Sequence, residues 1–454
     1  MIVSFSVSNF RSFSTEETFS LVASKRLSGS HENHAFPVPN SNEMVLKAGV
    51  IYGANGAGKS NLFKALEYLK VVALRPREKN SGTRRTPFRF GKTSDEISSF
   101  DIQFVAEGKL YRFGFKIDDR RITEEWLSQV MGGREKSIYE RTTDDKGNVT
   151  IDAAGLRGKK VKALTTIGGP QNQSFLATIL VTLNPEDINN DLKNVFRWLG
   201  QLILIEPDSI FSNLGNRLAS DQDLLKFSGN FLKSSSTGVD HLDVVKTLIT
   251  EDEIRNQFSS DVAESILEDI VDSEKGIKQY QIEEGLDIII ERTEKHQYFR
   301  ITVRAAHQHH AGEIIPMELT EESDGTRRLL NLIPALYHLQ MQKAVYFIDE
   351  IDRSMHPILV WKFLEFFLKS CDAGQRQIIV TTHESNLLDM DLLRRDEIWF
   401  AEKDSSASTR LYSLMDFKIR KDLEIRKHYL QGRFGAVPFL GNIDRLLPDK
   451  GSQE

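Results

Sequence analysis

One segment constrains the fold of this chain more than any other. A short apolar run, Val50-Ile51-Tyr52, leads into Gly53-Ala54-Asn55-Gly56-Ala57-Gly58-Lys59-Ser60, and a helical pattern, Asn61-Leu62-Phe63-Lys64-Ala65-Leu66, follows. The spacing Gly-x-x-x-x-Gly-Lys-Ser forms a phosphate-binding loop when a strand precedes it and a helix follows it. Both conditions are met, so the sequence predicts an α/β fold that binds a triphosphate at this turn.

Each residue type in the loop has a chemical role. Glycines at 53, 56 and 58 let the backbone approach phosphate oxygens, where a Cβ atom would interfere. The N–H groups of the loop and of the helix start attract the anion. Lys59 is expected to reach the β- and γ-phosphates, and the Ser60 hydroxyl is expected to bind Mg²⁺. All eight residues from Gly53 to Ser60 are therefore predicted to bind nucleotide.

A second segment predicts the catalytic half of the site. The apolar run Ala344-Val345-Tyr346-Phe347-Ile348 ends in Asp349 and Glu350. A carboxylate at the end of a buried strand that faces a phosphate loop holds Mg²⁺ through water, which is the role predicted for Asp349. The next carboxylate, Glu350, is placed to orient the attacking water or accept its proton.

Two further segments have both an ordinary and a functional interpretation. Ser323 or Asp324 caps a helical pattern that begins after Glu322, and a Ser-x-Gly turn at a helix start is either a common cap or a seat for an anion. The strand pattern from Gln377 ends at His383. That histidine is either an ordinary strand-end residue or a sensor of the γ-phosphate.

In this order the segments resemble the nucleotide-binding domain of ABC-type ATPases, in the RecF/SMC/OLD-like branch. The resemblance implies ATP and Mg²⁺ as ligands, and catalytic roles for Glu350 and His383. It implies that Arg11, in Asn9-Phe10-Arg11-Ser12-Phe13, approaches nucleotide phosphates. Ile351-Asp352-Arg353-Ser354-Met355-His356-Pro357 is similar to the loop that crosses the dimer interface in this branch.

The resemblance also implies assembly. Ser323 and Gly325 of one subunit would close over ATP held by another, which gives a head-to-tail dimer or a higher homo-oligomer. The signature here is Glu-Ser-Asp-Gly-Thr rather than Leu-Ser-Gly-Gly-Gln/Glu, so only Ser323 and Gly325 carry over. The lid-loop glutamine of the family has no clear counterpart, and Gln103 is the best candidate.

A narrower resemblance concerns the stand-alone bacterial AAA-family ATPases with an ABC core. It rests on Glu350-Ile351-Asp352, Ser354-x-His356-Pro357, Thr382-His383-Glu384-Ser385 and Tyr429-Leu430-x-Gly432-Arg433-Phe434-Gly435-Ala436-Val437-Pro438. That group includes the ATPase subunits of anti-phage systems such as PARIS, Septu and the AbiL type. It implies a separately encoded effector, often a nuclease. A RecF-like DNA repair ATPase is the alternative, and an ATP binder that does not hydrolyse is a third.

The expected fold is an ABC-ATPase domain, a mixed sheet plus an antiparallel β-meander, with a mainly helical insert. The meander strands are predicted at Phe100–Val105, Leu110–Ile117 and Ile122–Val130. Residues 1–185 form the first half of the ATPase domain, 186–300 the acidic helical insert and 301–454 the second half. The acidic side of the insert is either a solvated face or a docking surface for a partner.

Charge and composition limit the remaining classes. The net charge of -6 argues against a nucleic-acid binder over its whole surface. The basic run 70–92 is either a set of solvated loops or a track for a DNA backbone. No apolar run is long enough to cross a membrane, and the single cysteine, Cys371, fits a reducing cytoplasm. In His307-Gln308-His309-His310 the end of a hairpin is favoured over a metal site.

Overall fold

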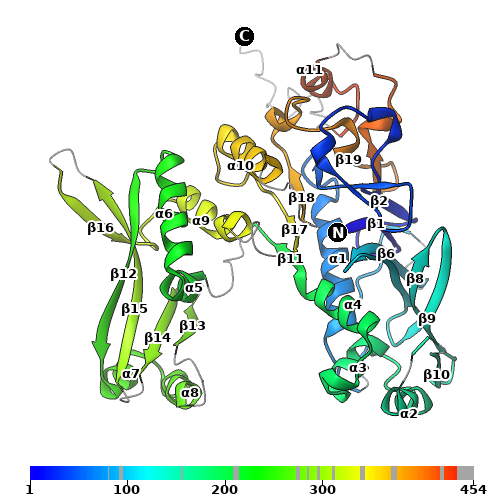
Figure 1. Ribbon diagram of the computed structural model, residues 1–454, viewed down its shortest axis with the longest axis horizontal. Coiled ribbons are helices and arrows are strands. Elements are labelled where there is room, and N and C mark those ends of the chain that lie inside the picture. Colours follow the sequence, from blue (N-terminus) through cyan, green and yellow to red (C-terminus); the bar gives the residue numbers. More distant parts are fainter. Residues whose placement is uncertain are drawn as a thin grey trace, which may run out of the picture. The chain divides into compact units, whose positions relative to one another are not determined.

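The computed structural model describes residues 1–79, 81–91, 96–153, 155–156, 158–207, 214–271, 277–283, 286–293, 297–308, 312–337, 343–369, 376–419 and 424–436. The chain divides into two compact units (Figure 1). Unit 1 comprises Met1–Glu206, Gln342–Ile351 and Leu368–Glu454. Unit 2 comprises Pro207–Met341 and Asp352–Phe367.

Unit 1 contains a seven-stranded antiparallel sheet in the order β10-β9-β8-β7-β6-β1-β2. Its strands are β1 (Ile2–Ser8), β2 (Glu17–Ser20), β6 (Ser98–Ala106), β7 (Lys109–Ile117), β8 (Ile122–Met131), β9 (Arg134–Thr143) and β10 (Val149–Asp152). The strands β6, β7 and β8 pair in succession. They are the predicted meander, which is confirmed.

The second sheet of unit 1 has six strands in the order β11-β17-β18-β5-β19-β20. These are β5 (Ala48–Tyr52), β11 (Leu202–Ile205), β17 (Val345–Ile348), β18 (Gln377–Thr382), β19 (Ile398–Lys403) and β20 (Thr409–Ser413). Five of them run parallel and β20 is antiparallel. The apolar strands β5, β17 and β18 are buried throughout, as expected for parallel strands covered on both faces. The predicted α/β class with a mixed sheet is confirmed.

Helix α1 (Lys59–Leu74) packs between the two sheets of unit 1 (Figure 1). The ring of Phe63 lies 5.3 Å from that of Phe347 in β17, and the ring of Tyr68 lies 5.3 Å from that of Phe100 in β6. The start of α1 is thus fixed relative to both sheets. The unit also contains β3 (Ala35–Pro37), β4 (Met44–Leu46), α2 (Lys159–Ile167), α3 (Phe175–Thr182), α4 (Asn190–Gln201) and α11 (Ile425–Leu430).

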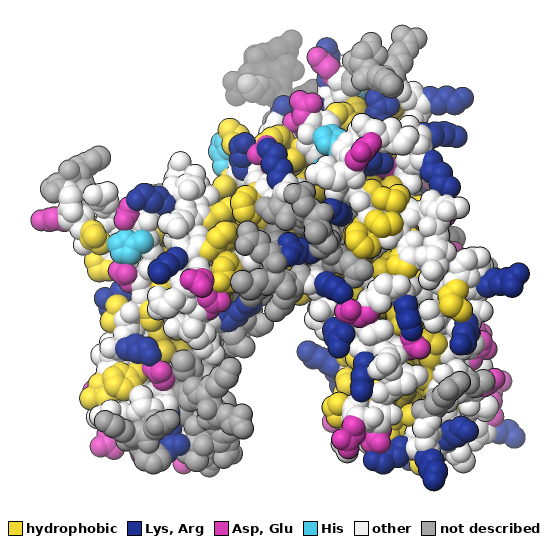
Figure 2. Space-filling model, in the orientation of Figure 1, with side chains coloured by type: hydrophobic (Ala, Val, Ile, Leu, Met, Phe, Trp, Pro, Cys, Tyr) yellow, Lys and Arg dark blue, Asp and Glu magenta, His cyan; other side chains and the backbone are white. Residues whose placement is uncertain are grey.

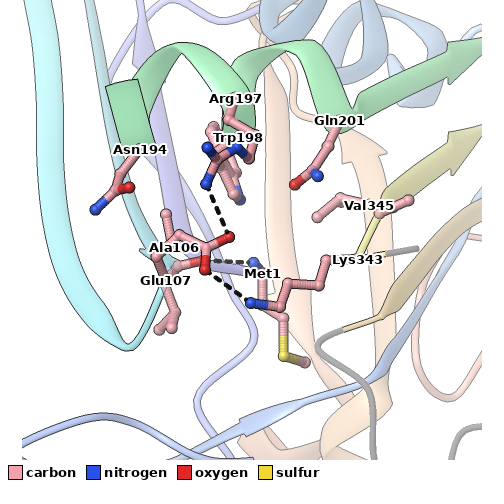
Figure 3. A pocket seen from close by; sticks show the side chains of 11 residues that line it. Met1, Ala106, Glu107, Asn194, Arg197, Trp198, Gln201, Lys343 and Val345 are labelled. Carbon is pink, nitrogen blue, oxygen red and sulfur yellow. Dashed lines mark hydrogen bonds and ion pairs between the residues drawn. The ribbon is translucent and has the colours of Figure 1, made fainter. Parts of the chain in front are cut away.

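A group of opposite charges links α4, the β6–β7 turn and Lys343, which lies two residues before β17 (Figure 3). Glu107 pairs with Lys343 at 2.9 Å and with Arg197 at 3.5 Å. The hydrogen bond from Lys343 lowers the pKa of Glu107. The cavity beside them, about 10 Å³, has room for one water molecule at most, so this cluster is an interaction within the fold.

Unit 2 contains a five-stranded antiparallel sheet with helices. The helices are α5 (Leu214–Ser220), α6 (Gln222–Ser234), α7 (Glu251–Gln257), α8 (Ser260–Val271) and α9 (Asp324–Tyr337). The strands are β12 (Val239–Ile249), β13 (Ile277–Glu283), β14 (Leu286–Arg292), β15 (Tyr298–Gln308) and β16 (Ile314–Glu318). Helix α10 (Pro357–Lys369) begins in this unit.

The structure differs from the expected mainly helical insert over residues 186–300 on two points. Strand β12 pairs with β15 along nearly its whole length. It shows no clear alternation of apolar and polar residues, because much of it is only half-buried. The compact unit also begins at Pro207, since α4 belongs to unit 1, where Trp198 stacks on Phe104 at 3.9 Å.

Gln377 is a buried cross-link within unit 1. Its side-chain oxygen accepts from the Ile2 N–H at 2.6 Å, and its amide nitrogen donates to the carbonyl oxygens of Ile2 and Leu46 at 2.9 and 2.7 Å. One side chain at the start of β18 therefore satisfies backbone groups of β1 and β4.

We predict that Gln377→Leu destabilises the protein, because three buried backbone groups lose their partner. Each buried polar group left unpaired costs about 1–3 kcal/mol, so the free energy of unfolding should fall by roughly 3 kcal/mol or more. Thermal unfolding measures this, with the exposed Gln257→Leu as the matched control. Equal melting temperatures for the two variants would contradict the cross-linking role.

Candidate nucleotide-binding site

The loop from Gly53 to Gly58 connects β5 to α1, with Asn55 and Gly56 exposed at its tip. A Cβ at residue 53 would lie 2.5 Å from the Ala401 carbonyl oxygen, and one at residue 58 would lie 2.0 Å from the Thr409 hydroxyl. Gly56 and Gly58 also have positive φ angles, 77° and 107°. Two of the three glycines are therefore required by close contact with β19 and β20, a reason that the sequence did not show.

Lys59 is buried at the start of α1, and its ammonium group turns back onto its own loop. It donates to the Gly53 carbonyl at 2.8 Å and to the Ala54 carbonyl at 3.3 Å. The Nε2 atom of His383, directly after β18, lies 3.0 Å from the same nitrogen. The structure thus brings the predicted lysine and the predicted strand-end histidine together.

The two predicted carboxylates follow β17 and meet a threonine of β18. The Thr381 hydroxyl donates to Asp349 Oδ1 at 2.5 Å and accepts from the Glu350 N–H at 2.8 Å. Asp349 is 3% exposed, and Glu350 has a φ of 47°. A non-glycine residue in this left-handed region is strained, and such strain is often found at functional sites. Thr381 was missed because its role depends on the β17–β18 register.

Glu206 is a further acid at the same edge of the sheet. Strand β11 is the parallel neighbour of β17, and the Asp349 N–H donates to the Ile205 carbonyl at 2.9 Å. Glu206 directly follows and forms an ion pair with Lys64 of α1. The sequence pattern had no signal for this residue, because the strand order alone places β11 beside β17.

Gln103, the candidate lid-loop glutamine, is not at this edge. It lies within β6, opposite Ser4 and Arg112. Its neighbours Ile102 and Phe104 are buried in the core that contains α1, and successive strand side chains point to opposite faces. The Gln103 side chain is therefore directed away from α1, and this candidate is wrong.

The turn that carries Arg11 touches the start of α1. The Asn61 amide donates to the Ser12 hydroxyl at 2.8 Å. Arg11 itself is exposed with a φ of 51°, and its N–H donates to the Thr86 carbonyl at 2.7 Å. The turn is thus adjacent to the phosphate loop, while contact between Arg11 and a nucleotide stays a prediction.

The predicted signature lies in unit 2. The Ser323 hydroxyl accepts from the Thr326 N–H at 3.2 Å, so Ser323 caps α9. A Cβ at residue 325 would lie 2.7 Å from the Ser354 carbonyl oxygen. Gly325 is therefore required where the signature packs on the segment after Ile351. This contact joins two motifs that the resemblance singled out.

Within the histidine segment, residues 307–310, the described residue His307 has a structural role. His307 Nε2 lies 2.6 Å from the carboxylate of Glu322, the buried residue before the signature serine. His309 and His310 lie outside the described residues. No group of three or more His, Cys, Asp or Glu side chains that could hold a metal occurs in the described part of the chain.

A magnesium ion bound to a triphosphate needs fewer than three protein ligands. Mg²⁺ in such sites is held by one or two side-chain oxygens together with phosphates and water. The Ser60 hydroxyl at the start of α1 and the Asp349 carboxylate at the end of β17 are hard oxygen donors of this kind. The chemistry of this pair fits Mg²⁺.

The basic run 70–92 is not one exposed track. Lys70 donates to the Leu202 carbonyl at 2.6 Å, and burial lowers its pKa. Arg85 is buried and pairs with Asp119 at 2.6 Å. Basic side chains are interspersed with acidic and uncharged ones on the face shown in Figure 2. The exposed basic residues of the run are Arg75, Lys79, Arg84 and Arg89, and Lys92 lies outside the described residues.

Residues 50–389 match the family model described as "AAA domain, putative AbiEii toxin, Type IV TA system". The chain belongs to this AAA-domain family. The match extends from the strand before the phosphate loop to beyond His383, and so includes both sequence segments that form the site. A search of curated protein sequences gave no match.

The solved structures that are similar to the chain include two SMC heads. One is the SMC head domain from Thermotoga maritima, with 11% identity, coverage of 92% of this chain and 99% of that chain, and a TM-score of 0.37. The other is an SMC head bound to the C-winged helix domain of ScpA, with 15% identity, coverage of 91% and 97%, and a TM-score of 0.39. Among the described residues, no helix combines the length and apolar character needed to cross a membrane.

We predict that Thr381→Val slows ATP hydrolysis about tenfold at saturating ATP, because Asp349 and Glu350 both lose the hydroxyl that orients them. ATP affinity should change little, because the phosphate loop keeps its contacts. Steady-state hydrolysis and calorimetric binding measure the two effects. Thr381→Ser keeps the hydroxyl and should retain most of the activity, so equal losses in both variants would contradict this role.

Proposed function

We propose that this AAA-domain protein binds and hydrolyses ATP at the carboxyl edge of the six-stranded sheet. One observation carries the proposal. His383, directly after β18, contacts Lys59 at the end of the phosphate loop, and Thr381 of β18 contacts the Asp349 carboxylate and the Glu350 N–H. A triphosphate-binding turn and a pair of acids thus converge on one strand end, which is where ligands of parallel α/β sheets bind.

Each residue of the site has a distinct role in ATP binding or hydrolysis under this proposal. Lys59 is already desolvated beside two carbonyl groups, and it would exchange them for the β- and γ-phosphates, which are stronger acceptors. Ser60 and Asp349 would hold Mg²⁺, which supplies neutralisation of phosphate charge. Glu350 would orient the attacking water and accept its proton. His383 would contact the γ-phosphate, and Arg11 the phosphates from the neighbouring turn.

The same proposal includes a second copy of the chain. Ser323 caps α9, Ser323 and Asp324 are exposed, and the start of a helix attracts anions. We place this helix start over ATP held by another subunit, which links assembly to nucleotide state. A dimer is the minimum, and a higher homo-oligomer is consistent with the same contact.

Two variants test the site. Lys59→Ala should weaken ATP binding by roughly 100-fold or more, because charge-assisted bonds to the phosphates are lost. Glu350→Gln should keep binding, reduce hydrolysis by about 10²–10⁴-fold and accumulate a nucleotide-bound dimer. Calorimetry, phosphate release and light scattering measure these quantities.

Lys116→Ala is the matched control for charge removal, since Lys116 pairs with Glu124 on the meander. It should behave like the wild type in all three measurements. Wild-type hydrolysis by Glu350→Gln would overturn the catalytic assignment.

At the level of biology, we propose that the protein is a cytoplasmic sensor and scaffold in anti-phage defence, which controls a separately encoded effector, a nuclease. The family description, with its AbiEii and toxin–antitoxin terms, supports a role of this kind. Unit 2 offers the docking surface, because Glu251, Asp252 and Glu253 are exposed at the start of α7. These acids favour a partner with a basic surface.

The alternative is a RecF-like repair ATPase that clamps DNA. It has less support, because Lys70 and Arg85 of the basic run are engaged within the fold. DNA binding measured by anisotropy between low and moderate salt separates the two. The defence proposal expects weak binding, whereas tight binding at low salt that falls steeply with salt would favour the repair ATPase.

A further inference from the structure

A network of hydrogen-bonded side chains contacts the phosphate loop and has no role in the proposed reaction. The Asn61 amide donates to the Ser12 hydroxyl at 2.8 Å. The hydroxyl oxygens of Ser12 and Thr409 lie 2.7 Å apart, and that of Thr409 lies 2.9 Å from the Ala57 carbonyl oxygen. This network joins α1, the turn that carries Ser12, strand β20 and the phosphate loop.

The number of protons available determines which group donates in each of these hydrogen bonds. Each hydroxyl carries one proton, and the Ala57 carbonyl can only accept. Thr409 therefore donates to Ala57, and Ser12 donates to Thr409. The Thr409 N–H also donates to the Ser12 carbonyl at 2.7 Å, and Thr409 is fully buried. Thr409 is thus held from both sides, with its hydroxyl directed at the loop.

The contact with Ala57 determines how one peptide group of the loop is oriented. A trans peptide is planar, and its carbonyl and N–H point in opposite directions. Since the Ala57 oxygen points to Thr409, the N–H of Gly58 points away from β20. Gly58 itself packs on the threonine so closely that a Cβ would lie 2.0 Å from its hydroxyl. The loop backbone is therefore pressed against β20.

The C-terminal sequence motif, residues 429–438, contacts the other end of β20. The Tyr412 hydroxyl donates to the Phe434 carbonyl at 2.8 Å. The ring of Tyr429 lies 5.9 Å from that of Tyr52, directly before the loop, and 5.7 Å from that of Phe400 in β19. The described part of the motif, up to Ala436, thus packs on the strands that contact the phosphate loop, while Val437 and Pro438 lie outside the described residues.

We propose that Thr409 is a positioning residue for the phosphate loop, which it orients so that the Gly58 N–H faces the triphosphate. The inference rests on the proposed ATP binding and deepens it. A glycine-rich loop has many accessible conformations, and fixing it before the ligand arrives reduces the entropy lost on binding. Thr409 acts on ATP through the loop and touches no reacting atom, so it affects binding more than the chemical step.

The test compares Thr409→Val, which keeps the shape and removes the hydroxyl, with Thr409→Ser, which keeps the hydroxyl. Thr409→Val should raise KM and the Kd for Mg-ATP about tenfold, with kcat changed less than about twofold. Thr409→Ser should restore both constants to within about twofold. Thr143→Val is the matched control, because the buried Thr143 hydroxyl donates to the Ile122 carbonyl at 2.7 Å, away from the loop.

The outcomes separate this inference from the proposed function. Wild-type KM and Kd in Thr409→Val would overturn the positioning role alone, whatever the change in melting temperature. Absence of ATP binding by the wild type would overturn the proposed function and the positioning role with it. If Thr409→Val does not fold, Thr409→Ala removes the same hydroxyl, and with it the bond to Ala57, without placing a methyl group against Gly58. It should raise KM with kcat retained, and an unchanged KM would overturn the role.

Discussion

The parallel pairing of β5 and β17 with β18 is the constraint on which the site depends. Thr382 is opposite Tyr52, and Val380 is opposite Ile348, so the three strands end at one edge of the sheet. The residues that follow them are the phosphate loop, Asp349 with Glu350, and His383. Carboxyl ends of parallel strands leave unpaired backbone groups and helix starts, which suits anions and metals. Buried Thr381 and Lys59 then connect these residues by direct contacts.

The rest of unit 1 keeps this edge in place. The aromatic contacts of α1 fix the helix start between the sheets, and Gln377 ties the beginning of β18 to β1 and β4. Strands β19 and β20 pack closely against the phosphate loop at Gly53 and Gly58. Protein contacts on several sides therefore restrict the conformation of the loop, which favours a site organised before ATP arrives.

Much of this was predictable from sequence, and most of the exceptions depend on which strands are neighbours. The phosphate loop, the strand before Asp349, the meander and the cap at Ser323 follow from residues close together in the chain. The roles of Thr381, Thr409 and Glu206 depend on which strands are neighbours and in which register, and no local pattern encodes that. Gln103 failed for another reason: its neighbours Ile102 and Phe104 face the core that contains α1, so its own side chain points to the other face of β6. Strand β12 was missed because partial burial removes its alternation.

The central claim is that the six-stranded sheet edge holds ATP in half a site and a second copy supplies the other half. A structure of the Glu350→Gln variant with ATP and Mg²⁺ tests it most directly. The account predicts phosphates against Lys59 and Ser60 of one subunit, with Ser323 and Gly325 of another subunit on the γ-phosphate. ATP bound at any other place, or phosphates with no signature residue from a second copy, would contradict it.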